Sequence, residues 1–198
     1  KLETAANMAS FGIEDMVTDF EVFGEHLAIA INNPGHHLLY QWLTGVPGER
    51  LAMPMEPPRG KWLVCGYGRF GQAVSRHLDK EGIELVVVDE HPAAGYENCV
   101  IGRGTEAHTL LEAGIEQAVG IVAGTNDDIA NLSIAMTARQ LKPELFMVLR
   151  QNRHANAALF ERFAANATMQ PSSIVAHEFL SMLTTPLLSR FFNLALNQ

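Results

Sequence analysis

The chain has 198 residues, of which 47% are hydrophobic and 18% are charged, so it can bury a core and is not intrinsically disordered. Its formal net charge of −8 argues against nucleic acid or an anionic membrane surface as the main partner. No apolar run in the sequence approaches the ~18 residues that a membrane-spanning helix needs.

The N-terminal segment, residues 1–43, does not alternate strands with helices. Lys1–Ser10 is interpreted as the end of a helix, Met16–Thr18 as a short strand and Phe20–Ile31 as a helix with one apolar face. Pro34 breaks that pattern before a second helix over Gly35–Leu43. Two helices without a sheet cannot bury their apolar faces alone, so we expect this segment to pack on another part of the protein.

Prolines and glycines concentrate in residues 44–60, which predicts an extended, semi-rigid linker. From Lys61 onward, short apolar runs alternate with helical patterns, which indicates an α/β fold with a doubly wound parallel sheet covered by helices on both faces. The predicted strands are Lys61–Cys65, Leu85–Asp89, Asn98–Ile101, Gly120–Ala123 and Leu145–Leu149. The predicted helices are Arg69–Glu81 ended by Gly82, Glu106–Ala113 capped by Thr105, and a third from Thr125 or Asn126 to Gln140.

The first strand and its helix carry a dinucleotide-binding fingerprint, the sequence G-x-G-x-x-G over Gly66–Gly71. In this motif, the first glycine permits a tight turn, the second lets the backbone approach a phosphate, and the third lets the helix pack closely on the strand. The helix N-terminus offers N–H groups and a positive dipole end to that phosphate. Asp89 ends the second strand, 23 residues after Gly66, where an acid is expected to hold ribose hydroxyls. The pattern therefore predicts binding of NAD(H) or an adenine nucleotide.

The C-terminal region is expected to form a helix over Asn152–Ala165 and a sixth short strand at Thr168–Gln170. Two further helices, Ser172–Leu183 and Leu187–Leu196, follow around a break at Pro186. This tail repeats the N-terminal segment at an offset of 152 residues, so residues 1–43 should fold like residues 153–195. Their similar apolar faces could then meet about an approximate two-fold axis, within or between chains, although a chance similarity is the alternative.

The two cysteines, Cys65 and Cys99, lie on predicted strands that another strand separates, so they are too far apart for a disulfide. Reduced, buried cysteines in a cytosolic protein are the expected state. No histidine pair has the H-x-x-x-H spacing of a metal site on one helix, and no C-x-x-C pair occurs.

From Lys61 to about Arg190 the chain resembles an RCK domain (regulator of potassium conductance, also called KTN or TrkA-N). The resemblance is carried by the glycine loop with Val88-Asp89, by two further segments, and by the strand ending Val148-Leu149-Arg150. Those two segments are Gly102-Arg103-Gly104-Thr105 with Leu111-Glu112-Ala113-Gly114-Ile115, and Ala123-Gly124-Thr125-Asn126-Asp127-Asp128 with Asn131.

The resemblance implies a cytoplasmic nucleotide-sensing domain that gates a membrane-embedded potassium channel or transporter at the inner face of the membrane. The ligand would be NAD(H) or an adenine nucleotide such as ATP, ADP or AMP. The resemblance also implies a homodimer, or a larger even-numbered ring, formed through the helical tail at about residues 172–196. The expected division is therefore a tail of a preceding unit (1–43), a linker (44–60) and a nucleotide-binding domain (61–198). Because the chain begins with Lys1 rather than Met and has no signal peptide, we expect a fragment of a longer protein.

The candidate nucleotide-binding residues lie in the glycine loop and at the ends of the strands. They are Gly66, Tyr67, Gly68, Arg69, Phe70, Gly71, Asp89, Glu90, Arg103, Gly104, Thr105, Ala123, Gly124, Thr125, Asn126 and Arg150. Arg103 departs from the family, which commonly has an aspartate there that helps to hold the adenosine. A cation at this position could meet a phosphate or pair with Glu90, or the nucleotide could bind differently or weakly.

Two other functions compete with a regulatory sensor. A nicotinamide-dependent oxidoreductase would need a substrate domain with an acid/base group, and the residues outside the sheet read instead as a linker and two helical tails. An oligomerisation module with a vestigial nucleotide site would explain Arg103. We expect no catalytic residues and no metal.

Overall fold

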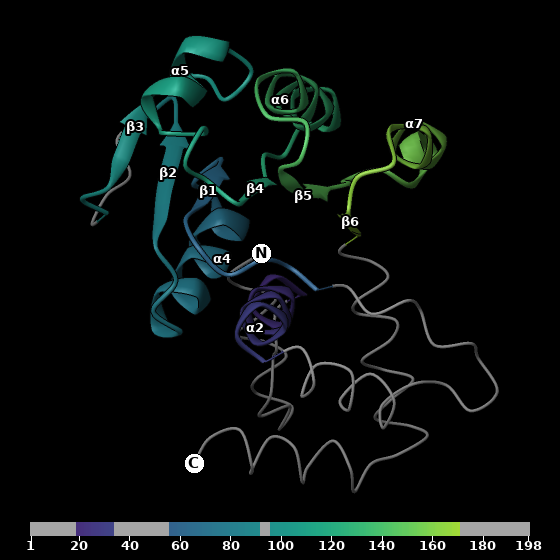
Figure 1. Ribbon diagram of the computed structural model, residues 1–198. Coiled ribbons are helices and arrows are strands. Elements are labelled where there is room, and N and C mark those ends of the chain that lie inside the picture. Colours follow the sequence, from purple (N-terminus) through teal and green to yellow (C-terminus); the bar gives the residue numbers. More distant parts are fainter. Residues whose placement is uncertain (1–18, 34–55, 92–95, 171–198) are drawn as a thin grey trace, which may run out of the picture.

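The structure, a computed structural model, describes residues 19–33, 56–91 and 96–170 (Figure 1). The predicted elements in 1–18, most of the linker and the helical tail after residue 170 lie outside the described residues. The similarity between the two ends of the chain, and the division into three segments, therefore stay predictions.

The described residues form a parallel six-stranded sheet with the order β3-β2-β1-β4-β5-β6, which confirms the predicted fold class. The chain builds the sheet outward from β1 to β3 and then crosses to the other side of β1 to begin β4. This reversal creates a topological switch point between β1 and β4, the place where open α/β sheets bind ligands. The strands are β1 (Trp62–Cys65), β2 (Leu85–Asp89), β3 (Cys99–Ile101), β4 (Gly120–Ala123), β5 (Phe146–Arg150) and β6 (Ala167–Met169).

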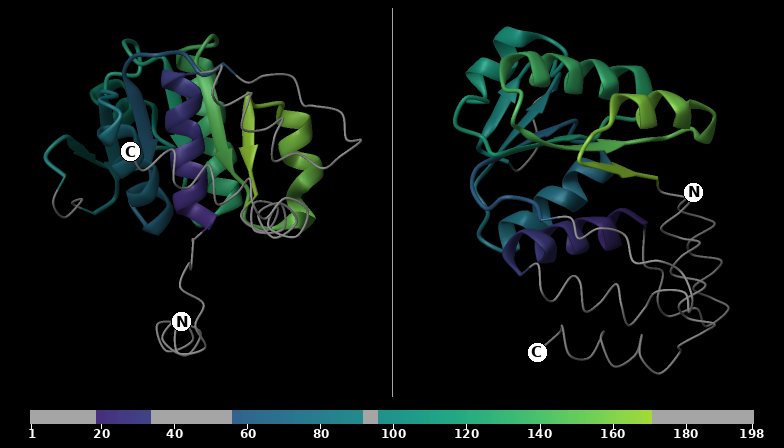
Figure 2. Two further views of the ribbon diagram at one scale, coloured as in Figure 1. Left: turned by 90° about the horizontal axis from the view of Figure 1, so that it is seen from below. Right: turned by 45° about the vertical axis from the view of Figure 1, so that its right-hand side comes forward.

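Helices cover both faces of the sheet, as Figures 1 and 2 show from three directions. Helix α4 packs on one face of the sheet, and α2 packs on the outer side of α4. Helices α5 and α6 cover the other face. The helices are α2 (Asp19–Asn32), α4 (Arg69–Lys80), α5 (Ala107–Glu112), α6 (Asp128–Leu141) and α7 (Ala157–Phe163), with a 3-10 turn η1 (His154–Asn156) before α7. No helix within these described ranges is both long and apolar enough to cross a bilayer.

Strands β1, β2, β4 and β5 send alternate side chains into separate cores, because successive residues of a strand point to opposite faces. Leu63 and Cys65 of β1 are buried toward α5 and α6, whereas Trp62 and Val64 are buried toward α4. All four have 1% or less of their surface exposed, so β1 is buried on both faces, as the central strand of a parallel sheet should be. Cys65 and Cys99 are free thiols, as predicted.

Two predicted helix starts were wrong by a few residues. The N-cap of α5 is Glu106 rather than Thr105, whose backbone oxygen instead accepts a hydrogen bond from the Thr137 hydroxyl of α6. The N-cap of α6 is Asp127, which accepts from the backbone N–H groups two and three residues ahead. Sequence alone could not choose between neighbouring polar residues, because several of them can cap a helix.

Helix α2 packs against α4, which confirms that the apolar face predicted for Phe20–Ile31 is buried on another part of the protein. Gly24 permits the close approach: a Cβ there would lie 3.1 Å from the Ala73 backbone oxygen. At the edge of the interface, Glu21 accepts a hydrogen bond from Arg76 at 2.6 Å and lies 3.0 Å from His77 Nε2. Leu27 and Ile31 of α2 are buried in the same core as α4.

The start of α6 is tied to the segment after β5 by the buried carboxylate of Asp128. It accepts hydrogen bonds from the backbone N–H groups of Asn152 and Arg153 and from the side-chain amides of Asn152 and Asn156, at 2.6–3.1 Å. Arg153 has extended backbone (φ −121°, ψ 124°), which is why the helix predicted to begin at Asn152 begins only after it. Burial would raise the pKa of Asp128, but the hydrogen bonds from Asn152, Asn156 and Arg153 bring it below its usual value.

We predict that Asp128→Asn lowers the free energy of unfolding by about 2–3 kcal/mol at pH 7, because an amide cannot accept from all of these donors. Since the pKa of Asp128 is lower in the folded protein, its contribution is present above the unfolded pKa of about 3.9 and is lost as pH falls through the folded value. Urea unfolding from pH 7 to pH 3 should show the difference between wild type and variant shrinking at acid pH.

The neighbouring change Asp127→Asn is the matched control, since asparagine also caps helices well and the Asp127 side chain is exposed. An Asp128→Asn protein as stable as Asp127→Asn would contradict the assigned role.

Candidate functional site

The glycine loop joins β1 to α4 by a turn that only glycine allows. Gly66 has φ +95°, and its N–H donates to the Val88 carbonyl at 2.8 Å, which holds the loop against β2. A Cβ at Gly71 would lie 1.9 Å from the Gly66 oxygen, so α4 starts in direct contact with the turn. A Cβ at Gly68 would meet no protein atom within 4 Å. The first and third glycines are therefore fixed by packing, while the backbone at the second is open on its outer side.

Helix α4 begins at the pocket without a side-chain cap, because its N-cap is Gly68. The N–H groups at a helix start have no partner within the helix, and they carry the positive end of the dipole. The Gln72 amide donates to the Tyr67 carbonyl at 3.1 Å and so braces the loop from within α4. A helix start with this geometry is suited to bind an anion.

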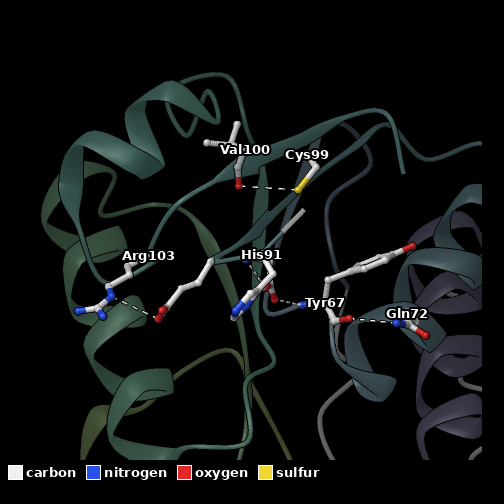
Figure 3. Close-up of polar contacts among 8 residues, drawn as sticks. Tyr67, Gln72, His91, Cys99, Val100 and Arg103 are labelled. Carbon is white, nitrogen blue, oxygen red and sulfur yellow. Dashed lines mark hydrogen bonds and ion pairs between the residues drawn. The ribbon is translucent and has the colours of Figure 1, made fainter. Parts of the chain in front are cut away.

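Asp89, at the end of β2, is hydrogen-bonded to the glycine loop, and Figure 3 shows the two residues that donate to it, Tyr67 and His91. Its carboxylate accepts from the Tyr67 N–H at 2.6 Å and from the His91 N–H at 2.9 Å. A carboxylate offers about four lone-pair positions, so these bonds orient Asp89 and leave acceptor capacity for hydroxyl groups. Asp89 thus both fixes the loop and presents a charged acceptor beside it.

Arg103, after β3, points toward Glu90, and the two side chains lie at the rim of the pocket (Figure 3). The distance between Arg103 Nε and Glu90 Oε1 is 3.3 Å, and both side chains are more than half exposed. An exposed pair of this kind contributes little to stability. Of the two roles expected for Arg103, the structure has the pairing with Glu90.

The ends of β4 and β5 are held together by Asn131 of α6, which is fully buried. Its side-chain oxygen accepts from the N–H and hydroxyl of Thr125, at 2.9 and 2.7 Å. Its amide donates to the carbonyls of Thr125 and Arg150, at 3.0 and 2.7 Å. Every polar group of the Asn131 side chain is therefore used to set the positions of the two strand ends.

The Arg150 guanidinium lies against two aromatic rings. Its Cζ atom is 4.8 Å from the centroid of Phe20 and 5.4 Å from that of Phe70. Its Nη1 atom lies 3.4 Å from the Gly124 carbonyl oxygen. Arg69 Cζ lies 5.9 Å from the same Phe20 ring.

These groups surround a pocket of about 530 Å³ at the carboxyl ends of the strands, a size typical of small-molecule sites. Most of the predicted residues line it: Gly66, Gly68, Arg69, Asp89, Glu90, Arg103, Gly104, Thr105, Gly124, Thr125, Asn126 and Arg150. Four predicted residues do not line the pocket. Tyr67 donates its backbone N–H to Asp89, and its ring packs on Tyr96. Phe70, Gly71 and Ala123 are buried. Lining residues that were not predicted are Phe20, Cys65, Val88, His91, Gly102, Ala130 and Ile134.

Phe20 is the unpredicted lining residue with the clearest consequence. The sequence placed it on a helix but gave no sign that this helix reaches the pocket.

Cys65 also lines the pocket, where burial and the charge of Asp89 raise the pKa of its thiol to about 12. Cys65 therefore stays protonated at neutral pH and is not a nucleophile.

Comparisons with known proteins match the part of the chain that forms the sheet and the pocket. The TrkA-N domain model matches residues 62–171. Potassium channel protein 1 of Methanocaldococcus jannaschii is 23% identical over 140 residues, which are 67% of this chain and 42% of that channel. The chain thus spans less than half the length of this relative.

Several solved structures share the fold at 25% identity or more. The GsuK channel bound to NAD is 28% identical with a TM-score of 0.56, and the match covers 65% of this chain and 24% of that one. The Shewanella denitrificans Kef CTD in its AMP-bound form is 25% identical with a TM-score of 0.56, covering 69% of this chain and 95% of that one.

The packing of the glycine loop predicts opposite results for two glycines. Gly71→Ala should lower the free energy of unfolding by about 1–3 kcal/mol, because the added methyl group meets the backbone oxygen of Gly66. Gly68→Ala should cost less than about 1 kcal/mol, since Gly68 has φ −70° and open space beside it. Urea unfolding of both variants measures the difference, and equal stabilities would show that the loop is not packed as described.

Proposed function

The chain belongs to the TrkA-N domain family, and from this membership we propose that it is a nucleotide-sensing regulatory domain that controls a potassium channel or transporter. The single observation that carries the proposal is one pocket in which an uncapped helix start and the open face of Gly68 lie opposite Asp89. N–H donors for a phosphate and a carboxylate acceptor for hydroxyl groups, both at one sheet edge, fit a nucleotide.

The ligand we propose is NAD(H) or an adenine nucleotide such as ATP, ADP or AMP. The names of two similar structures, one bound to NAD and the other to AMP, support this class of ligand. Asp89 would hold the ribose, with Glu90 and Arg103 at the rim beside it. The N–H groups at the start of α4 would hold phosphate, with Arg69 and Arg150 as the nearby cations.

The transport role rests on the relatives. The Methanocaldococcus jannaschii relative is named as a potassium channel, and the GsuK structure is also of a channel. We propose that this chain lies in the cytoplasm at the inner face of the membrane, against a channel or transporter partner. Homodimers or larger even-numbered rings would form through the helical tail at about residues 172–196. The domain would then report nucleotide occupancy to the transport protein.

A regulatory role is favoured over an oxidoreductase by the groups that line the pocket. The Cys65 thiol is held protonated, and Asp89 is engaged with two backbone N–H groups. Among the described residues, no three His, Cys, Asp or Glu side chains gather as a metal ion would require. The pocket supplies phosphate and ribose contacts, and we assign no catalytic residue in it.

Nucleotide binding is tested by thermal and chemical unfolding with NAD, NADH, ATP, ADP and AMP. A nucleotide at 100 times its Kd should add about 2.7 kcal/mol to the free energy of unfolding. Asp89→Asn should weaken this effect, because the amide keeps an oxygen for the Tyr67 N–H but loses the charge that ribose hydroxyls prefer. Glu84→Gln is the matched control. Glu84 is an exposed acid that immediately precedes β2, whereas Asp89 is the last residue of that strand.

If none of these nucleotides at millimolar concentration changes the melting temperature, the chain is better described as an oligomerisation module with a vestigial site. Loss of binding in Glu84→Gln as well as in Asp89→Asn would mean that net charge, not the pocket, governs affinity.

Catalysis is tested separately. We predict no oxidation of NADH at enzyme-like rates when the purified protein is mixed with small carbonyl or alcohol substrates. Absorbance at 340 nm measures this directly, and sustained turnover would establish an oxidoreductase in place of a sensor.

A further inference from the structure

We propose that Phe20 of α2 is a positioning residue of the nucleotide site, which holds Arg150 at the phosphate end of the pocket and couples nucleotide binding to the docking of α2 on α4. Phe20 belongs to the segment before the dinucleotide-binding fold, yet its ring lines the same pocket as the glycine loop and Asp89. The inference rests on the proposed function, because it assigns phosphate to this end of the pocket.

The geometry around Arg150 restricts its guanidinium on several sides. The Phe20 ring lies 4.8 Å from its Cζ atom, the Phe70 ring lies 5.4 Å away, and the Gly124 carbonyl oxygen is 3.4 Å from Nη1. The two rings meet edge to face, with centroids 5.6 Å apart and planes at 78°. Phe70 is fixed in the core, with none of its surface exposed. Phe20 is therefore the contact of Arg150 that would be lost if α2 moved away from the pocket.

The same ring also faces the second cation of the pocket. Arg69 Cζ lies 5.9 Å from the Phe20 centroid, within the distance at which a guanidinium is attracted to an aromatic face. Arg69 and Arg150 both line the pocket on the side of the α4 start, whereas Asp89 and Glu90 line it beside the ribose position. An aromatic ring close to two cations offsets part of their mutual repulsion.

Helix α2 is positioned by contacts that do not involve the pocket. Glu21 binds Arg76 and His77 of α4, and Phe23 packs on Phe70 at a centroid distance of 5.6 Å. Buried Leu27 and Ile31 extend the same contact along α4. The docking of α2 thus decides where Phe20 lies, and the Phe20 ring is one of the groups that contact Arg150.

A coupling of this kind is reciprocal. If docked α2 favours phosphate binding by some factor, bound phosphate must favour docked α2 by the same factor. Because α2 lies outside the sheet domain, the nucleotide state would be passed to the neighbouring part of the protein through one aromatic contact.

The test compares ligands with and without phosphate on the full chain. Kd values for ADP and for adenosine are measured by calorimetry for wild type, Phe20→Ala and Phe163→Ala. We expect Phe20→Ala to weaken ADP binding by roughly threefold to tenfold and adenosine binding by less than about twofold. Phe163→Ala is the matched control: it also removes an aromatic ring from an arginine, Arg139, but neither residue lines the pocket or belongs to α2. Its ADP-to-adenosine ratio should equal that of wild type.

Conservative variants of Phe20 distinguish a role of its aromatic ring in positioning Arg150 from a simple effect of side-chain volume. Phe20→Tyr should restore ADP affinity, because it keeps the aromatic face, while Phe20→Leu should not. This pair also decides the question if Phe20→Ala fails to fold. Equal ADP affinity for the Leu and Tyr variants would overturn the proposal.

Hydrogen exchange gives the reciprocal measurement. Addition of ADP should slow exchange of the α2 amides in wild type and in Phe163→Ala, and the effect should be smaller in Phe20→Leu. Wild type that binds ADP without any added protection of α2 would overturn the coupling while leaving the proposed function intact. Wild type that binds neither ADP nor adenosine would overturn the proposed function itself, and the inference with it.

Discussion

The contact between α4 and the glycine turn is the constraint on which the rest of the site depends. The position of Gly71 against the Gly66 oxygen leaves no room even for a methyl group, so the helix must begin directly above the end of β1. That single approach aims the N–H groups of the helix start at the pocket and, through Tyr67, places one loop N–H on Asp89. The phosphate side and the ribose side of the pocket are therefore set by one piece of backbone packing.

The other side of the switch point is built by a different kind of interaction. Asn131 and Asp128 are buried polar side chains of α6 that use their hydrogen-bonding groups on the ends of β4 and β5 and on the segment that follows. A buried polar group is costly unless it is satisfied, so these bonds restrict the strand ends to one arrangement. Backbone packing fixes the half of the pocket at β1 and β2, and side-chain hydrogen bonds fix the half at β4 and β5.

Helix α2 adds a wall that neither half supplies. It reaches the pocket because Gly24 lets it lie close to α4, and because its apolar side chains complete the core on that face of the sheet. A regulatory domain must pass its ligand state to other parts of a protein, and a helix from outside the fold that contributes a ring to the site offers a direct physical route. The exposed pair between Arg103 and Glu90 lies at the opposite rim, where a change of partner would cost little.

The parallel sheet, the glycine loop and most of the pocket lining could be predicted from the amino-acid sequence alone. These features follow from local patterns: apolar runs of strand length, a fixed glycine spacing, and an acid at the end of the second strand. Residues that end parallel strands share one edge of the sheet, which is why Asp89, Gly104, Thr125 and Arg150 could be assigned to one site.

Contacts between segments that no local pattern connects could be seen only in the three-dimensional structure. Asp128 has the sequence context of a helix-start residue, yet it binds donors more than twenty positions away, at Asn152 and Asn156. Phe20 was read as part of an amphipathic helix, and its place over Arg150 follows from how α2 docks on α4. Periodicity tells which face of a helix is buried but not which partner buries it, because that choice depends on the packing of the whole chain.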